Sequence, residues 1–100
     1  NFMPNKYAQL NKSEAEFDFH NLGILTGDEI IKLTDDFINN AQENNYKKIS
    51  FVVGQGKHSK NGAVIKPLLQ EYLSSHSQVK KIQPGKFAAG GEGVLMVDLV

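Results

Sequence analysis

The stretch KISFVVGQGKHSKNG at residues 48–62 decides the predicted fold. Its first part, KISFVV, is mostly β-branched or aromatic, which is typical of a buried strand in a β-α-β unit. Its second part, GQGKHSKNG, is rich in glycine and lysine, which indicates a loop. Apolar side chains then recur at helical spacing over residues 65–73, so the loop is predicted to join a strand end to a helix start.

Strand and helix patterns continue on both sides of this stretch. Phe17 and Phe19 alternate with polar residues, which predicts a strand with both rings on one face. Thr26 and Glu29 form a capping box, which marks the start of a helix. That helix is predicted to end near residue 44. Two further strands are predicted at 79–83 and 93–100, with the loop PGKFAAGGE between them.

These elements predict an α/β domain, a two-layer sandwich of order β-α-β-α-β-β with a four-stranded mixed sheet. Right-handed crossovers make the first three strands parallel. We expect both helices on one face of the sheet and the other face partly open. Pro67 fits the second helix only in its first turn, where the missing amide hydrogen is harmless. Residues 1–15 are expected to be a flexible N-terminal arm before a domain at 16–100.

Composition limits the kinds of site the chain can form. There is no cysteine, which excludes disulfides and thiolate metal sites and leaves the redox compartment open. The apolar runs are far shorter than the roughly 18 residues that cross a bilayer, and no basic and apolar leader opens the sequence. We therefore expect a soluble, cytoplasmic domain without a membrane partner.

The charges are balanced in total but separated along the chain. Residues 1–45 hold eight acids and three lysines, net −5, whereas residues 46–100 hold eight lysines and three acids, net +5. A basic face is thus compatible with a net charge of zero. All eleven basic residues are lysines, so contacts to phosphate are expected and base reading by arginine is excluded.

Asp18 and His20 are the first candidate site residues. Alternation places both on the face opposite the phenylalanines, near the C-terminal end of the first strand, and ligands of open α/β sheets bind beyond such strand ends. A carboxylate beside an imidazole can orient the ring as a general base, or the two can hold a divalent cation. The alternative is an exposed polar pair on a solvated sheet face.

Residues 54–62 would gather free backbone amides and the positive end of a helix dipole around one small volume, which suits a phosphate. The expected nucleic-acid-binding residues are Gly54, Gln55, Gly56, Lys57, Ser59 and Lys60. The loop matches neither G-x-x-x-x-G-K-[ST] nor G-x-G-x-x-G, so mononucleotide and dinucleotide sites are disfavoured. The alternative is a long flexible connection.

Other polar residues have simpler interpretations. His76 is expected at the surface where the second helix ends, and Tyr72 is expected in the core. Lys80, Lys81 and Lys86 either extend a basic surface or belong to a solvated loop.

Three motifs in order resemble the Smr (small MutS-related) domain family. FDFH at residues 17–20 is similar to its L-D-x-H motif, and VGQGKHSKNG at 53–62 resembles its T-G-x-G-x-H-S stretch. GGEGVLMVDL at 90–99 resembles its closing strand. The resemblance covers about residues 16–100 and implies a fold akin to the C-terminal domain of translation initiation factor three.

The resemblance implies nucleic acid, branched or structured DNA or RNA, as the partner. Some members nick DNA or cleave RNA, with or without a divalent metal such as magnesium, and others are terminal modules of MutS paralogues or ribosome-associated factors. The matching positions imply a catalytic set of Asp18, His20 and His58, with His20 as general base and Asp18 as its orienter or a metal ligand. An endonuclease and a non-catalytic docking module of a larger chain both stay open.

Two positions depart from the family's pattern. The family has His or Thr just before the first loop glycine, where this chain has Val53, and the missing polar group favours binding over cleavage. The turn NLGIL at residues 21–25 is longer than the usual H-G-L-T connection, which affects the placement of the first helix relative to the loop.

Overall fold

The computed structural model describes residues 13–19, 22–54, 60–84 and 93–100, with the backbone alone for 60–64 and 84. Its elements are β1 (Ala15–Asp18), α2 (Gly27–Glu43), β2 (Lys48–Val52), α3 (Lys60–Ser74), β3 (Val79–Pro84) and β4 (Val94–Leu99). This is the predicted order β-α-β-α-β-β. Among the described residues, no helix combines the length and apolar character needed to cross a membrane.

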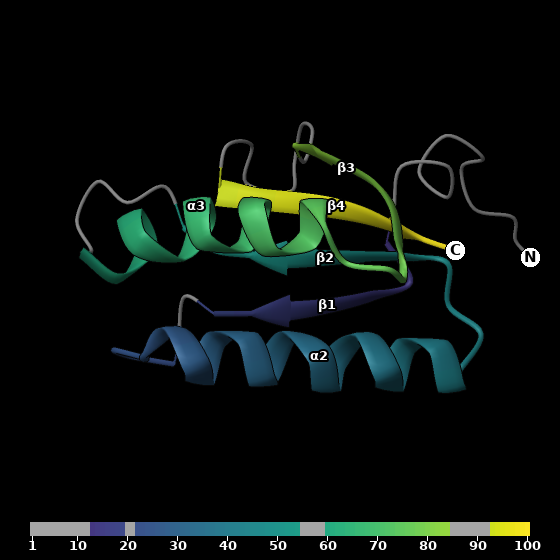
Figure 1. The fold of residues 1–100 in the computed structure, drawn as a ribbon, viewed down its shortest axis with the longest axis horizontal. Coiled ribbons are helices and arrows are strands. Elements are labelled where there is room, and N and C mark those ends of the chain that lie inside the picture. Colours follow the sequence, from purple (N-terminus) through teal and green to yellow (C-terminus); the bar gives the residue numbers. More distant parts are fainter. Residues whose placement is uncertain (1–12, 20–21, 55–59, 85–92) are drawn as a thin grey trace, which may run out of the picture.

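The four strands form one mixed sheet in the order β1-β2-β4-β3 (Figure 1). β1 pairs with β2 in parallel, whereas β4 is antiparallel to both β2 and β3. β1, β2 and β3 therefore point in the same direction, which confirms the prediction for the first three strands. β2 and β4 are central, and β1 and β3 are the edges.

The capping box that predicts the first helix is present at its N-terminus. The Glu29 carboxylate accepts the Thr26 amide at 2.7 Å, and the Thr26 hydroxyl accepts the Glu29 amide at 3.1 Å. Two amides that lack partners within the helix are satisfied in this way. The helix ends at Glu43 with Asn44 as its C-cap, and Asn45 takes a left-handed backbone conformation with φ of 62°.

The main core lies between the sheet and both helices. Ile49 and Phe51 of β2 stand opposite Val97 and Leu95 of β4, and all four side chains are buried. The apolar stripes of the helices pack against this face through Ile30, Ile38 and Ala41 from α2 and Ile65, Leu69 and Leu73 from α3. Both helices lie on one face of the sheet, as predicted (Figure 1).

The opposite face of the sheet is less open than predicted. Ser50, Val94 and Met96 alternate with the main-core residues of β2 and β4, yet all three are buried. The Ser13 hydroxyl lies 2.8 Å from the Ser50 hydroxyl, so residue 13 helps to cover Ser50. Burying apolar side chains such as these is worth about 1.5–3 kcal/mol each, which explains why the central strands do not leave them in water.

Pro67 is not in the first turn of the second helix, so that prediction is wrong. α3 begins at Lys60, inside the predicted loop, and Pro67 lies within the helix. Proline cannot donate to the carbonyl four residues before it, which weakens a helix interior. The buried stripe of Ile65, Leu69 and Leu73 spans the proline on both sides, and its packing holds the helix together across this position.

Candidate functional site

β1 and β2 are parallel neighbours and end side by side. The border of the sheet where their C-terminal ends lie is called the shared edge, as distinct from the outer strands β1 and β3. Asp18 is the register partner of Val52, and the Phe19 amide donates to the Val52 carbonyl at 2.8 Å. α2 and α3 both begin on the side of the molecule where these strands end (Figure 1). The two stretches that carry the predicted site residues therefore leave the sheet at a common edge.

Gly54 is the point where the chain leaves β2. Its φ of 77° lies in the left-handed region, which glycine adopts without steric cost. The amides of Val53 and Gly54 both donate to the carbonyl of Gly93, at 2.7 and 3.2 Å. Gly93 directly precedes β4, so a third segment meets the first two at this edge.

Asp18 is half-buried at the end of β1. Its neighbours Phe17 and Phe19 turn toward the main core, with ring centroids 4.8 Å apart and Phe19 fully buried. Strand alternation leaves Asp18 on the other face, as expected from the sequence. Val53 is fully buried in the main core. The side chain at the position where the family has His or Thr is therefore used for packing here.

Only part of the predicted site lies within the described residues. Asp18 and Gly54 are at the shared edge, and Lys60 is the first residue of α3. The predicted loop extended to residue 62, and it is shorter because α3 already begins at Lys60. The other predicted site residues, His20, Gln55, Gly56, Lys57, His58 and Ser59, lie outside the described residues.

The two helix N-termini at this edge differ in charge. The first turn of α2 contains Asp28 and Glu29, and the Glu29 carboxylate already accepts an amide hydrogen bond there. The first turn of α3 contains no acid and begins with Lys60. A helix N-terminus carries a partial positive charge that acids of its own first turn offset. The N-terminus of α3 is thus the better place for an anion.

Known proteins share the sequence pattern and the fold of this chain. A family model described as the Smr domain matches residues 17–100. The chain belongs to the Smr domain family. The match begins within β1 and continues through β4, close to the range of 16–100 over which the sequence resembles the family.

Solved structures of other Smr proteins have the same fold as this Smr domain. The Smr domain of Thermus thermophilus MutS2 superposes with a TM-score of 0.71 at 23% identity, covering 86% of this chain and 98% of that one. YdaL, a stand-alone small MutS-related protein from Escherichia coli, gives a TM-score of 0.73 at 16% identity, covering 96% of this chain and 77% of that one. At these identities the likeness concerns the fold.

A sequence relative comes from Treponema pallidum (strain Nichols) and is an uncharacterized protein. It is 31% identical over 84 residues, which are 84% of this chain and 40% of the relative. This Smr domain therefore spans less than half the length of that relative.

The metal site that the family resemblance implies has one ligand candidate in the described part of the domain. No three His, Asp or Glu side chains lie together among the described residues. At the shared edge Asp18 offers carboxylate oxygens, the kind of ligand that magnesium takes. The two histidines of the predicted catalytic set lie outside the described residues.

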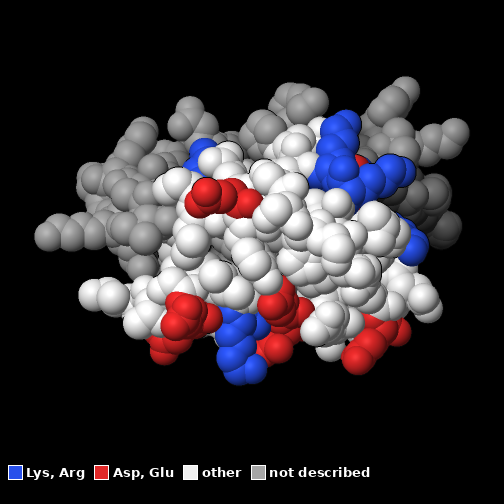
Figure 2. All heavy atoms as spheres, in the orientation of Figure 1, with Lys and Arg blue, Asp and Glu red and all other residues white. Residues whose placement is uncertain are grey.

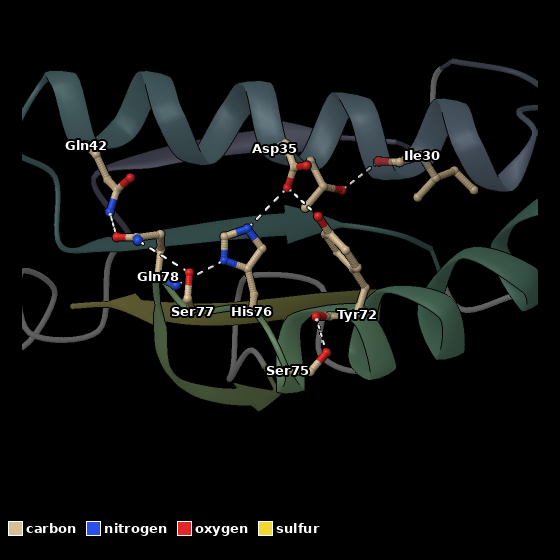
Figure 3. Close-up of polar contacts among 9 residues, drawn as sticks. Ile30, Asp35, Gln42, Tyr72, Ser75, His76, Ser77 and Gln78 are labelled. Carbon is tan, nitrogen blue, oxygen red and sulfur yellow. Dashed lines mark hydrogen bonds and ion pairs between the residues drawn. The ribbon is translucent and has the colours of Figure 1, made fainter.

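A polar cluster that the sequence patterns do not predict joins α2 to the end of α3 (Figure 3). One oxygen of Asp35 accepts the Tyr72 hydroxyl at 2.6 Å and lies 3.1 Å from Nε2 of His76. The carboxylate raises the pKa of Tyr72 to about 12, because the hydrogen bond and the negative charge favour the neutral phenol. Beside them, the Gln42 amide donates to the Gln78 side chain at 2.6 Å.

His76 is held in one tautomer by this cluster. The Gln78 amide donates to Nδ1 of His76 at 3.1 Å, so Nδ1 acts as the acceptor and Nε2 carries the hydrogen toward Asp35. The side chain is 14% exposed, so the expectation of a surface histidine is wrong. Tyr72 is half-buried, with its hydroxyl bonded, and is not simply a core residue. The spacing of four between Tyr72 and His76 was the available sequence signal, because the two rings meet where α3 ends, with centroids 5.5 Å apart.

Proposed function

We propose that this Smr domain binds nucleic acid at the edge where β1 and β2 end and hydrolyses a phosphodiester bond there. The observation that carries the proposal is the convergence of Asp18, Gly54 and the N-terminus of α3 on that edge. A carboxylate able to orient an imidazole and a helix end able to receive a phosphate are the two parts that such a reaction needs.

Phosphate binding is assigned to the segment between β2 and α3. The acid-free first turn of α3 supports this, because its amides and partial positive charge have no competing carboxylate. Gly54 and Gly56 allow the backbone to approach the ligand closely. Gln55, Lys57, Ser59 and Lys60 supply further donors or positive charge to the phosphate oxygens.

The proposed reaction is attack of water on the phosphorus atom. His20 accepts a proton from the water as its oxygen bonds to phosphorus, and Asp18 orients the imidazole. The bond from phosphorus to the leaving oxygen breaks, and that oxygen takes a proton from His58. Lys57 and Lys60 stabilise the negative charge on the phosphate oxygens. In the alternative role, Asp18 would help to hold a magnesium ion, which would supply further charge stabilisation.

Val53 favours a second candidate, a docking module that binds RNA, ribosomes or DNA without cleavage as part of a larger chain. Its side chain is fully buried in the main core, at a position where the family carries a polar residue. The domain would then bind phosphate at the same site but would lack the polar side chain that the family carries at position 53.

Cleavage assays test the first candidate. Purified domain is incubated with single-stranded RNA, structured RNA and supercoiled DNA, each with magnesium and with a chelator. Asp18→Ala, His20→Ala and His58→Ala are each expected to reduce the cleavage rate by about 10²–10⁴-fold, the range typical of general acid–base groups. Asp36→Ala, which removes an exposed carboxylate of α2, should leave the rate unchanged. Full cleavage by the three site variants would refute the mechanism.

Binding assays separate the two candidates. A docking module binds the same nucleic acids without cleaving them, retains affinity in Asp18→Ala and loses it when Lys57 and Lys60 are replaced by alanine. Wild-type protein that neither binds nor cleaves any of these nucleic acids would reject both.

A further inference from the structure

Lys80 and Lys81 differ from the other lysines whose side chains the structure describes. Lys32 pairs with Asp36 at 3.4 Å, and Lys48 pairs with Asp98 at 3.6 Å. The other two engaged lysines are Lys47, which donates to the carbonyl of Val100 at 3.2 Å, and Lys66. Lys80 and Lys81 are exposed and have no ion pair or hydrogen bond with another described side chain. Their positive charges are therefore available to a ligand.

An irregularity in β3 brings these two charges together. Val79 pairs with Leu99 and Lys81 pairs with Asp98, so Lys80 is an extra residue without a partner in β4. Such a bulge interrupts the alternation of a strand and re-aims a side chain. Across the sheet from Lys81, Asp98 already has Lys48 as its ion-pair partner. This carboxylate is therefore already neutralised by Lys48, so the start of β3 keeps a net positive charge from Lys80 and Lys81.

A shallow hollow lies beside the two lysines. It has a volume of about 260 Å³ and is lined by Leu73, Ser74, Val79, Lys80, Lys81 and Ile82. The aliphatic members come from the end of α3 and from β3, and the two lysines belong to β3. The hollow is large enough for part of a nucleotide, whose phosphate would lie against the ammonium groups.

Most acidic side chains on the visible face lie away from β3. In the view of Figure 2, the basic atoms gather at the upper right, over the region of β3, and the acidic atoms are mainly along the lower side, over α2. The acids of α2 are Asp28, Glu29, Asp35, Asp36 and Glu43. A nucleic acid that reaches the edge where β1 and β2 end is therefore favoured to continue across the sheet toward β3 and away from α2.

We propose that Lys80 and Lys81 form a second phosphate-contact site for the same nucleic acid, in addition to the proposed site between β2 and α3. The inference rests on the proposed function and adds to it the direction in which the bound strand runs. In β4, Lys81 pairs with Asp98 and Val52 pairs with Val94, four residues apart. Together with two strand spacings across the sheet, this separates the backbones of Lys81 and Val52 by roughly 16 Å. One strand of a duplex spans this distance with about five phosphates.

Protection of an edge strand is the alternative role of these lysines. β3 is an edge of the sheet, and lysine on an edge strand discourages pairing with another chain. That role predicts aggregation of the lysine-free variants and no change in nucleic-acid affinity of the monomer. The proposal predicts monomeric lysine-free variants with weakened nucleic-acid affinity. The same variants therefore distinguish the two roles.

The test measures affinity by fluorescence anisotropy for labelled RNA and duplex DNA of matched sequence, over a range of salt concentrations. Lys80→Gln and Lys81→Gln are each expected to weaken binding by about three- to tenfold and to reduce the slope of log K against log salt by about 0.7–0.9. Lys32→Gln changes the net charge equally on the acidic side and should change neither quantity. Circular dichroism confirms that each variant is folded.

Ligand length gives an independent readout. A dinucleotide, which has one internal phosphate, cannot contact both sites at once. Wild type and the double variant Lys80→Gln/Lys81→Gln should therefore bind a dinucleotide equally, whereas an oligonucleotide of about twelve nucleotides should distinguish them. Double-variant affinity equal to that of Lys32→Gln on long ligands would overturn the second site while leaving the proposed function intact. A wild-type domain that binds neither RNA nor DNA would overturn both. Comparison of the RNA and DNA series shows which of the two supplies the phosphate.

Discussion

At the residue scale, Asp35 shows how one carboxylate can join two helices. Its helical position is on the polar side of α2, and it accepts hydrogen bonds from Tyr72 and His76 at the end of α3. The partners are 37 and 41 residues away in the sequence. No local pattern pairs residues so far apart, which is why the sequence predicted neither contact.

Tyr72→Phe tests the contribution of this carboxylate to stability. Near neutral pH the substitution should lower the free energy of unfolding by about 0.5–1.5 kcal/mol, because it removes one hydrogen bond to Asp35. The hydrogen bond to Asp35 raises the pKa of Tyr72 to about 12, so the neutral phenol stabilises the folded state fully below pH 10. This stabilisation is lost as the pH rises toward about 12 and the phenol ionises. Wild type and variant should therefore converge in stability over that range.

Urea unfolding at several pH values measures this difference. Tyr46→Phe is the matched control, because Tyr46 is also a half-buried tyrosine that packs against the core, and its hydroxyl makes no hydrogen bond to a described residue. Equal stability of wild type and Tyr72→Phe at neutral pH would show that the contact with Asp35 contributes nothing.

At the element scale, the sequence predicted most of the strands and helices, because their signals are local. The capping box at Thr26 and the β-branched and aromatic run of residues 48–53 are each local signals of a single element. Both elements are present in the structure, where the strand ends one residue earlier, at Val52. Pro67 misled the prediction for α3 because local propensity disfavours proline in a helix interior. Packing of Leu69 and Ile65 in the core outweighs that preference, and packing is a tertiary effect.

Pro67→Ala is expected to raise the free energy of unfolding by about 1–3 kcal/mol. The substitution restores an amide that can donate within α3 and removes the steric clash of the ring with the preceding turn. Part of the gain is offset because proline also restricts the unfolded chain, by about 0.4–1 kcal/mol. The midpoint of urea unfolding measures the effect. An unchanged or lower midpoint would contradict the prediction and show that Pro67 does not destabilise α3.

At the scale of the whole molecule, the sheet order places β2 and β4 between the two edge strands. The sequence predicted the fold class and the mixed sheet, since both follow from the order of elements. It could not predict the burial of Val94 and Met96 on the face away from the helices, because that depends on what covers the sheet. The candidate site was predicted both as residue types and as a place beyond the C-terminal ends of the strands, and of these residues the structure describes Asp18 and Gly54 at the ends of β1 and β2.

Hydrogen exchange should follow this arrangement. Backbone amides of Phe51 in β2 and Val97 in β4 are bonded within the centre of the sheet and buried, so they are expected to exchange slowest, at rates set by global unfolding. Amides of β1 and β3 should exchange faster through local opening at the edges. Mass spectrometry of exchanged peptides or amide NMR distinguishes the two classes. Uniform rates across all strands would contradict this hierarchy.

The position of β4 also bears on how the protein folds during its synthesis. β3 is hydrogen-bonded within the sheet to β4 alone, although β4 follows it in the chain. A nascent polypeptide that has emerged only as far as β3 therefore contains the pair β1 and β2 with both helices. Its β3 has no neighbouring strand with which to form hydrogen bonds. The sheet can be completed only after residues 94–99 leave the ribosome, so ribosome-stalled chains shortened before residue 94 should lack the cooperative unfolding of the whole domain.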